Sequence, residues 1–421
     1  MGGYWPGPWS GEDGGPARRQ APTAVAGPVL GPDSRLTVTS RTAPAATMVV
    51  TGDPGELYLL RHTAGDDAVS FVERLDPDTL EPRARSADLA GGPAWPGSLA
   101  VHADGALVVV FGRHAHRLDR HDLSVTATTR LPRDLPYNGF VVLADGVIVT
   151  KDFAGARPGT PVPAAERRPC ELVALAPGSL EVLDRITLAE PSIARLSADG
   201  TGVYVVGDTS LLRVRRDGRR LVADDAFRAR YRTDEGQTYG WDCVLAAGAA
   251  WFLDDGEGSD GYDGTLHGHG LSTAPLHLVR VDLDTAVVTT AVVCDGPGGL
   301  IANPPVVDTD RAVAVGYDSG NGVMHAFTIG RDGALASRWR RRQEHGGHLV
   351  HFPDTGTLLT GDFDRDRGVD QAVFLDVDSG DERARIDTDS PVQGVLFPAV
   401  GGDGSIYLCT FTTITRITVA S

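Results

Sequence analysis

The sequence lacks the features that mark a membrane protein, a nucleic-acid-binding protein or a disulfide-rich secreted protein. No apolar run approaches the roughly 20 residues that a membrane span needs. The formal net charge of −17 over 421 residues repels phosphate groups, so neither nucleic acid nor an anionic membrane is expected as a partner. The beginning of the chain has no basic segment followed by an apolar one, so we expect a cytoplasmic protein. The cysteines are far apart and predict neither a disulfide framework nor a metal site, being Cys170, Cys243, Cys294 and Cys409.

Lysine is almost absent as well. Only one of the 39 basic residues is a lysine, Lys151, and the others are arginines. A GC-rich coding bias favours arginine, so this imbalance is not functional by itself. Apolar residues make up 41% of the chain, and 52 glycines and 27 prolines accompany them. This composition allows a large core with many turns and excludes global disorder.

The chain consists of a repeated unit. An Asp-Gly pair between two apolar runs recurs at 101–110, 142–149 and 196–206, and each copy predicts a β-hairpin. A second pattern of strand, aspartate, turn and strand recurs at 73–82 and 279–285, and again at 373–380. Together they predict a four-stranded antiparallel unit with a period on the order of 50 residues, which is typical of a β-propeller blade. The units start near Thr47, Trp95, Tyr137, Pro191, Tyr239, Ile301, His348 and Pro391.

The predicted fold is therefore an all-β propeller with eight four-stranded blades, or seven if the first unit is irregular. The unit that starts at Pro391 has only about three strands. A strand at residues 34–40 can supply the missing one, which would close the ring and remove the exposed sheet edges. We expect residues 1–33, which are rich in Gly and Pro, to form a flexible segment, and residues 34–421 to form a single domain.

These repeats resemble the quinoprotein-like and lactonase-like propellers. The resemblance covers residues 34–421 and is architectural. The tryptophan-docking repeats of quinoprotein dehydrogenases are not apparent, so a quinone cofactor is not expected. The glycine-rich stretch at 316–322 follows the second strand of a unit and does not open a helix, so a nucleotide cofactor is not expected either. A propeller alone does not define a function.

The predicted topology brings polar residues to one face of the propeller. The segments that enter the innermost strand and those that leave the second strand of each blade meet there, which predicts a funnel for a small molecule. The long insertions at 152–168 and 254–273 belong to the same face and are suited to binding or gating. The candidate catalytic residues are Lys151, Asp242 and His348. The candidate substrate-binding residues are Tyr137, Asn138, Arg195, Trp241, Asn303, Tyr317, His345 and Gln393.

Several aspartates are candidate ligands for calcium or a similar divalent metal. Residues 362–370 place aspartates at alternate positions, which resembles the calcium loops of integrin-type propellers, although Arg367 stands where a glycine is usual. The alternative is that these aspartates only cap tight turns. The candidate ligands are Asp208, Asp318, Asp362, Asp364, Asp366 and Asp370.

Three functions remain open on this sequence. The first is an enzyme acting on a small molecule in the funnel, such as a metal-assisted, lactonase-like hydrolase with His348 or Lys151 as general base. The second is a non-catalytic scaffold or ligand-binding protein. The third is a lyase, isomerase or cyclase in which Lys151 forms an iminium with its substrate. The oligomeric state is not determined by the sequence.

Overall fold

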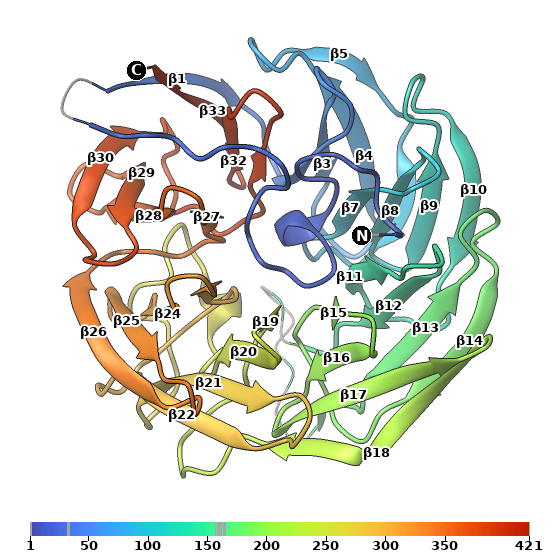
Figure 1. Ribbon diagram of the computed structural model, residues 1–421. Helices are drawn as coiled ribbons and strands as arrows, with labels where there is room; N and C mark the ends of the chain where they lie inside the picture. The colour runs from blue at the N-terminus through green and yellow to red at the C-terminus, as the bar shows by residue number, and fades with distance from the viewer. Residues whose placement is uncertain (1, 32–33, 156, 158–161, 163–165, 421) are drawn as a thin grey trace.

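The computed structural model describes residues 2–31, 34–155, 157, 162 and 166–420, and it shows an eight-bladed β-propeller (Figure 1). The prediction of an all-β ring of eight four-stranded antiparallel blades is confirmed. None of the helices in the described residues is long and apolar enough to cross a membrane.

The strands of each blade follow one another from the central channel outwards. Blade 1 contains β2 (Ala46–Thr51), β3 (Leu57–His62), β4 (Ala68–Leu75) and β5 (Pro82–Arg85), and β6 (Leu89–Gly92) also pairs with β4. Blade 2 contains β7 (Ser98–Val101), β8 (Leu107–Phe111), β9 (His114–Leu118) and β10 (Val125–Arg130). Blade 3 contains β11 (Tyr137–Val142), β12 (Ile148–Asp152), β13 (Glu171–Leu175) and β14 (Val182–Thr187). Blade 4 contains β15 (Ser197–Ala198), β16 (Val203–Val206), β17 (Ser210–Asp217) and β18 (Arg220–Arg230).

The second half of the ring repeats this order. Blade 5 contains β19 (Val244–Ala246), β20 (Ala249–Leu253), β21 (Leu276–Asp282) and β22 (Val288–Cys294). Blade 6 contains β23 (Val306–Asp308), β24 (Val313–Asp318), β25 (Val323–Ile329) and β26 (Leu335–Arg342). Blade 7 contains β27 (Val350–Phe352), β28 (Thr357–Asp364), β29 (Val369–Asp376) and β30 (Glu382–Asp387). Blade 8 contains β31 (Ala399–Val400), β32 (Ile406–Cys409), β33 (Thr413–Ala420) and, from the other end of the chain, β1 (Arg35–Thr42).

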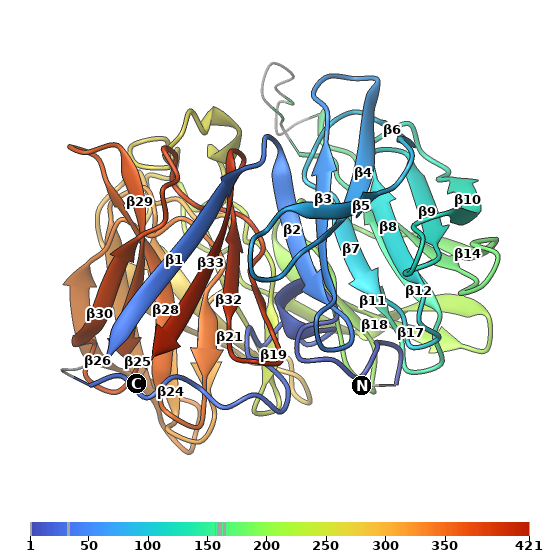
Figure 2. The ribbon, with the colours of Figure 1, turned by 90° about the horizontal axis from the view of Figure 1, so that it is seen from above.

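The pairing of β1 with β33 closes the ring. The two strands run antiparallel from the pair Arg35 and Ala420 to the pair Thr42 and Thr413, and Figure 2 shows them side by side. The N-terminal strand therefore supplies the outer strand of blade 8, as the sequence predicts. This arrangement leaves no unfinished blade whose edge would invite pairing with another chain.

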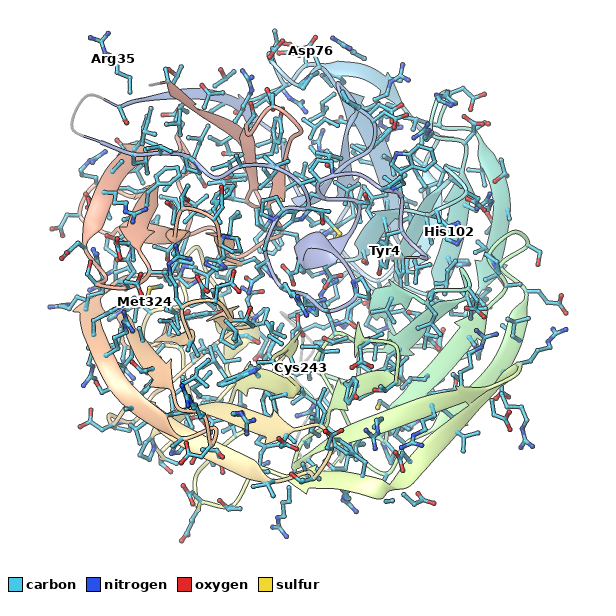
Figure 3. All side chains as sticks on the ribbon, viewed as in Figure 1. Tyr4, Arg35, Asp76, His102, Cys243 and Met324 are labelled. Carbon is cyan, nitrogen blue, oxygen red and sulfur yellow. The ribbon has the colours of Figure 1, made fainter. Side chains whose placement is uncertain are left out.

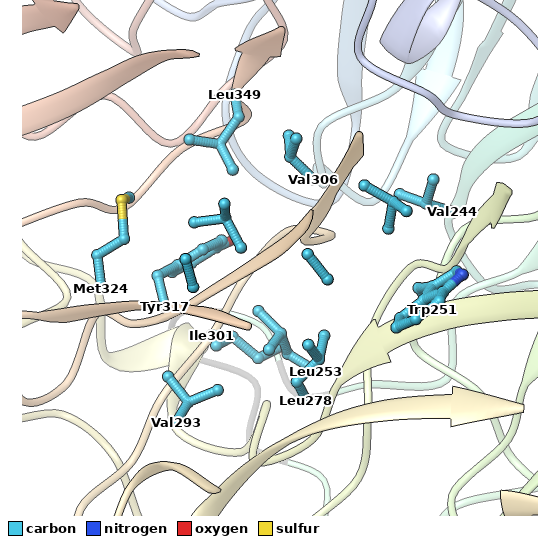
Figure 4. Close-up of a cluster of buried hydrophobic side chains, with 14 of the residues drawn as sticks. Val244, Trp251, Leu253, Leu278, Val293, Ile301, Val306, Tyr317, Met324 and Leu349 are labelled. Atoms are coloured by element: carbon cyan, nitrogen blue, oxygen red, sulfur yellow. The ribbon is translucent and has the colours of Figure 1, made fainter. Parts of the chain in front are cut away.

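The core lies between the blades. The inner strands are buried along their whole length, whereas outer strands such as β10 alternate between exposed and partly buried residues. Figure 3 shows Arg35 and Asp76 at the periphery and Cys243 near the centre. Figure 4 shows one of the buried clusters, in which Trp251 of blade 5 and Tyr317 of blade 6 take part. Two of the three Asp-Gly hairpins turn through a glycine at positive φ, Gly105 at 89° and Gly146 at 86°, whereas Gly200 in the third does not have a positive φ.

The described part of the N-terminal segment is not loosely ordered, in contrast to the expectation. Residues 3–20, which we call the plug, lie in the channel and include the short 3-10 helix η1 (Glu12–Gly14), seen at the centre of Figure 1. The amide of Trp5 donates to Val101 O at 2.9 Å, and Ala17 O accepts from the amide of Leu245 at 2.9 Å. Glycine and proline therefore form tight turns in this segment. The same composition is also typical of flexible segments, so composition alone could not predict the ordered structure.

Candidate functional site

A cavity of about 330 Å³ opens at the face where the chain enters the inner strands. The plug contacts the other ends of the same strands, at Val101, Ala198, Leu245 and His351. The cavity is therefore a blind cup and not a through-channel. Its large apolar lining side chains are Trp95, Trp241, Tyr262, Leu266, Phe397 and Phe411. Its polar lining side chains include His62, Arg195 and Asn303, and Asp66 and Arg157, which form an ion pair at 3.5 Å.

Local contacts hold the aromatic walls in place. Trp95 stacks on Phe153 with ring centroids 4.4 Å apart. The indole N–H of Trp241 donates to Gly256 O at 3.3 Å, and the hydroxyl of Tyr262 donates to Gln393 O at 2.8 Å. Both tryptophans lie just before an inner strand, which is the position that the sequence predicts to face the funnel. The polar ends of Trp241 and Tyr262 are satisfied, so the cavity receives their apolar faces.

The insertion at 254–273 crosses the funnel to blade 8, and Gln393 fixes it there. The side-chain carbonyl of Gln393 accepts the amide of Leu266 at 2.7 Å, and its backbone amide donates to Gly264 O at 2.8 Å. Its side-chain amide donates to Glu344 O at 3.0 Å. Gln393 does not line the cavity; it positions the loop that supplies Tyr262 and Leu266 to the wall.

Arg195 forms the floor of the cavity and is already engaged. Its Nη1 donates to Glu12 Oε2 at 2.9 Å, and its Nη2 donates to Pro96 O at 2.7 Å. Its guanidinium lies over the ring of Phe397 at 4.3 Å. Burial lowers the pKa of Arg195 by more than the carboxylates of Glu12 and Asp242 raise it. The cationic group at the bottom of the cup is thus paired from below by the plug.

Below the floor, the plug and the blades share a buried charge network. Arg18 pairs with Glu12, with Asp13 at 2.6 Å and with Asp242 at 2.7 Å. His348 Nδ1 lies 2.7 Å from Asp13 Oδ1. Burial raises the pKa of Asp13, but the charges of His348 and Arg18 outweigh it and hold the pKa below its ordinary value. The geometry gives Asp242 and His348, which the sequence offers as catalytic candidates, contacts with the plug and no place in the cavity lining.

Lys151 is also outside the cavity lining. It is 1% exposed, and its Nζ donates to the backbone carbonyls of Asp152 at 2.7 Å and of Ser192 at 2.9 Å. Burial lowers its pKa, since few favourable contacts replace the lost water. An iminium would need a carbonyl substrate to reach this amine, so the covalent function of Lys151 stays a prediction that borohydride trapping would test.

The predicted substrate-binding residues divide into two groups. Arg195, Trp241 and Asn303 line the cavity together. The other five lie outside its lining, and apart from Gln393, described above, they are buried in the blades. Their contacts are internal: the Tyr137 hydroxyl accepts the Arg133 amide, Asn138 donates to Ile193 O, Tyr317 donates to Asn303 O, and His345 Nδ1 accepts the Gly361 amide. Burial lowers the pKa of His345 to about 3, so its imidazole is neutral.

The predicted calcium loop is a β-hairpin. Asp362 pairs in register with Gln371 across β28 and β29, and Asp364 pairs with Val369. The pleat sends successive side chains to opposite faces, and arginines neutralise the acids that point outwards, such as Asp362, which lies 2.6 Å from Arg385. The exposed Asp366 lies in the turn, and Asp370 is buried.

The other two proposed ligands are separate from this hairpin. Asp208 pairs with Arg167 at 2.8 Å, and burial raises its pKa to about 6. Asp318 accepts the amides of Leu300 and Gly320, which is the turn-capping alternative. Across the described residues, no group of three or more His, Cys, Asp or Glu side chains could hold a metal ion. The predicted metal set is therefore not assembled in this structure, and we derive no chemical step through it.

The sequence did not predict some of the aromatic residues of the cavity or the charged residues of the plug. Tyr262, Phe397 and Phe411 resemble ordinary core aromatics in the sequence, and only the length of the 254–273 insertion pointed to one of them. Glu12 and Asp13 stand in a segment whose glycine and proline content suggested disorder. The presence of charged residues in this segment was the only feature of the sequence that could have indicated a structural role for it.

The sequence comparisons give no relative of this chain. No protein-family model matches the sequence, and no curated protein sequence matches it. Solved structures do match. Quinohemoprotein alcohol dehydrogenase from Comamonas testosteroni superposes with a TM-score of 0.65 at 11% identity, covering 97% of this chain and 80% of that one.

Two further structures match over nearly their whole length. BamB from Moraxella catarrhalis gives a TM-score of 0.61 at 11% identity, covering 91% of this chain and 100% of that one. A europium-containing methanol dehydrogenase gives a TM-score of 0.59 at 10% identity, covering 99% and 98%. At such identities the likeness concerns the fold alone. The chain is an eight-bladed propeller of quinoprotein-like architecture.

Proposed function

We propose that this protein binds a small molecule in the funnel cavity. The observation that carries the proposal is the blind cup of about 330 Å³, whose walls are aromatic and whose floor is a paired arginine. This volume is near the lower end of the range for ligand sites, and the mixture of apolar walls with a few fixed polar groups is typical of them. The occupant is therefore a compact molecule.

Calorimetric titration with 2-naphthol and indole tests this proposal. We expect saturable binding with one site per chain. Phe411→Ala removes an aromatic wall and should weaken binding by about tenfold or more, because about 1.5–3 kcal/mol accompanies the burial of an aromatic side chain. Phe71→Ala is the matched control, since Phe71 is also partly exposed but packs against Arg85 outside the cavity lining. If neither probe binds, or if both variants weaken binding equally, the cavity is not the site.

Catalysis on the bound molecule is a second candidate, and one side chain favours it. His62 lines the cavity, and its Nδ1 lies 2.7 Å from Thr63 O, so this nitrogen carries the proton and Nε2 has the free lone pair. Burial lowers the pKa of His62. Among the described residues Nε2 has no hydrogen-bond partner, and it is buried in this structure, so a substrate reaches it only when a neighbouring wall side chain moves aside. A neutral imidazole of this kind is suited to general-base catalysis, including the hydrolase activity expected from the sequence.

A screen with aryl esters and lactones tests the catalytic candidate. We expect any turnover to fall at least about a hundredfold in His62→Gln, as for other general bases. His121→Gln is the control, since His121 is exposed on blade 2 outside the cavity lining. Turnover that survives in His62→Gln would remove His62 from the mechanism, and the absence of turnover in the unaltered protein would favour binding alone.

A further inference from the structure

The cavity has one lining side chain whose orientation is fixed and whose acceptor remains free. Asn303 is 3% exposed, and its Nδ2 donates to two backbone carbonyls, Gly346 O at 3.0 Å and Val395 O at 3.3 Å. Because both neighbours are acceptors, the amide nitrogen must face them. The oxygen Oδ1 is left without a hydrogen-bond partner among the described residues, although Asn303 lines the cavity.

Asn138 provides an internal comparison. Its Nδ2 also donates to a backbone carbonyl, Ile193 O at 3.1 Å, but its Oδ1 is sealed in the blades and Asn138 does not line the cavity. The oxygen of Asn303 is not among the sealed, unpartnered atoms of the described residues. The remaining exposure of Asn303 therefore belongs to the cavity, where a ligand's hydrogen-bond donor can meet this oxygen.

The charges beneath the cavity do not favour an anion. Arg195 donates to Glu12 and to the carbonyl of Pro96, and Arg18 is surrounded by three carboxylates. The network contains three carboxylates, two guanidiniums and the imidazole of His348, so its total charge is zero or negative. An anionic ligand would find no unpaired cation on the floor and would lose its hydration.

Resting on the proposed function, we infer that the ligand of this cavity is a compact, largely apolar molecule that donates a hydrogen bond to Asn303 Oδ1 and carries no negative charge. The aromatic walls accept its apolar body. A hydroxyl or N–H group supplies the donor. A carboxylate or phosphate ester is disfavoured.

Three naphthalene probes that share one apolar body test this assignment by calorimetry. 2-Naphthol has a donor, 2-methoxynaphthalene has none, and 2-naphthoate is an anion at pH 7. We expect 2-naphthol to bind about three- to tenfold more tightly than the methoxy compound, the usual worth of one hydrogen bond, and more than about tenfold more tightly than the naphthoate. Equal binding of all three, or tightest binding of the naphthoate, would overturn the assigned ligand class and leave the cavity as a binding site. If none binds, the cavity itself is refuted together with the assignment.

Variants locate the effect. In Asn303→Leu, which keeps the volume and removes the acceptor, the ratio between 2-naphthol and the methoxy compound should fall towards one. Tyr262→Phe should keep the ratio, because the lost hydroxyl serves Gln393 O and not the ligand. A ratio that persists in a folded Asn303→Leu protein would overturn the role of Asn303. If that variant does not fold, the probe series on the unaltered protein still decides the ligand class.

Discussion

The two ends of the central channel bury polar groups in opposite ways. At the plug end, carboxylates and guanidiniums from different segments neutralise one another, as in the pairing of Arg18 with Asp13 and Asp242. At the cavity end, apolar rings cover the wall and hydrogen bonds to backbone carbonyls satisfy most polar tips. We infer from this contrast that the charged plug end stabilises the fold, whereas the apolar cavity end is available to bind a ligand.

The charged end should give the largest effect when it is broken. Arg18→Met leaves Glu12, Asp13 and Asp242 buried without their shared cation. Removing one partner from a buried ion network costs about 3–5 kcal/mol, and we expect a loss of that size in the free energy of unfolding. Arg19→Met is the control, because Arg19 is next to Arg18 in the sequence but its side chain is exposed. Denaturant titration measures both, and equal midpoints would show that the ion pairs of Arg18 do not contribute to stability.

A substitution at the cavity end should have a smaller effect on stability, confined mainly to the loop at residues 254–273. Gln393→Leu removes the acceptor of the Leu266 amide and leaves that buried donor unsatisfied, which costs about 1–3 kcal/mol. We expect faster hydrogen exchange and proteolysis within residues 254–273, together with weaker binding of 2-naphthol. Gln371→Leu is the control, because Gln371 lies on β29 of blade 7 and bonds Asp387 and Arg385 rather than this loop, which should stay unchanged. Unaltered exchange in Gln393→Leu would show that other contacts hold the loop.

The two ends also differ in the sign of their pH dependence. Burial raises the pKa of Asp370, near the cavity wall, to about 8, whereas the pKa of Asp13 in the plug is lowered. Between about pH 4 and pH 8 the folded protein keeps the Asp370 proton that the unfolded chain releases, so this residue makes stability fall as the pH rises. Asp13 acts in the opposite direction. Its lowered pKa contributes stability above the ordinary pKa of an aspartate, and this stability is lost as the pH falls below that value.

Asp370→Asn should therefore flatten the decline in stability between pH 4 and pH 8, and it should gain stability relative to the unaltered protein at the upper limit. Denaturation midpoints across that range measure the change. Asp364→Asn serves as the control, since Asp364 is only partly buried and lies near Arg367. A slope that is the same in Asp370→Asn as in the unaltered protein would mean that Asp370 is ionised in the fold.

The repeat was visible in the sequence because Asp-Gly hairpins and alternating apolar strands are local patterns. They predicted eight blades, the closing strand and the face on which Trp241 and Asn303 meet. The plug could not be predicted, since its partners in the blades are distant in the sequence, as with Arg18 and Asp242, which are 224 residues apart. Distant pairing of this kind leaves no periodicity. The direction of a side chain at a strand entrance was equally hidden, so Lys151 and His348 could not be separated from Asn303 without coordinates.

The contacts of the plug also constrain the order in which the protein can fold. Asp13 pairs with His348, and the side-chain carbonyl of Gln20 accepts the amide of Leu349, so both contacts join residues more than 300 positions apart. Before Asp242 and His348 have been synthesised, the buried charge network around Arg18 and Asp13 therefore lacks two of its members. The network is complete only when the chain has been made as far as blade 7, so folding must join segments that lie more than 300 residues apart in the sequence.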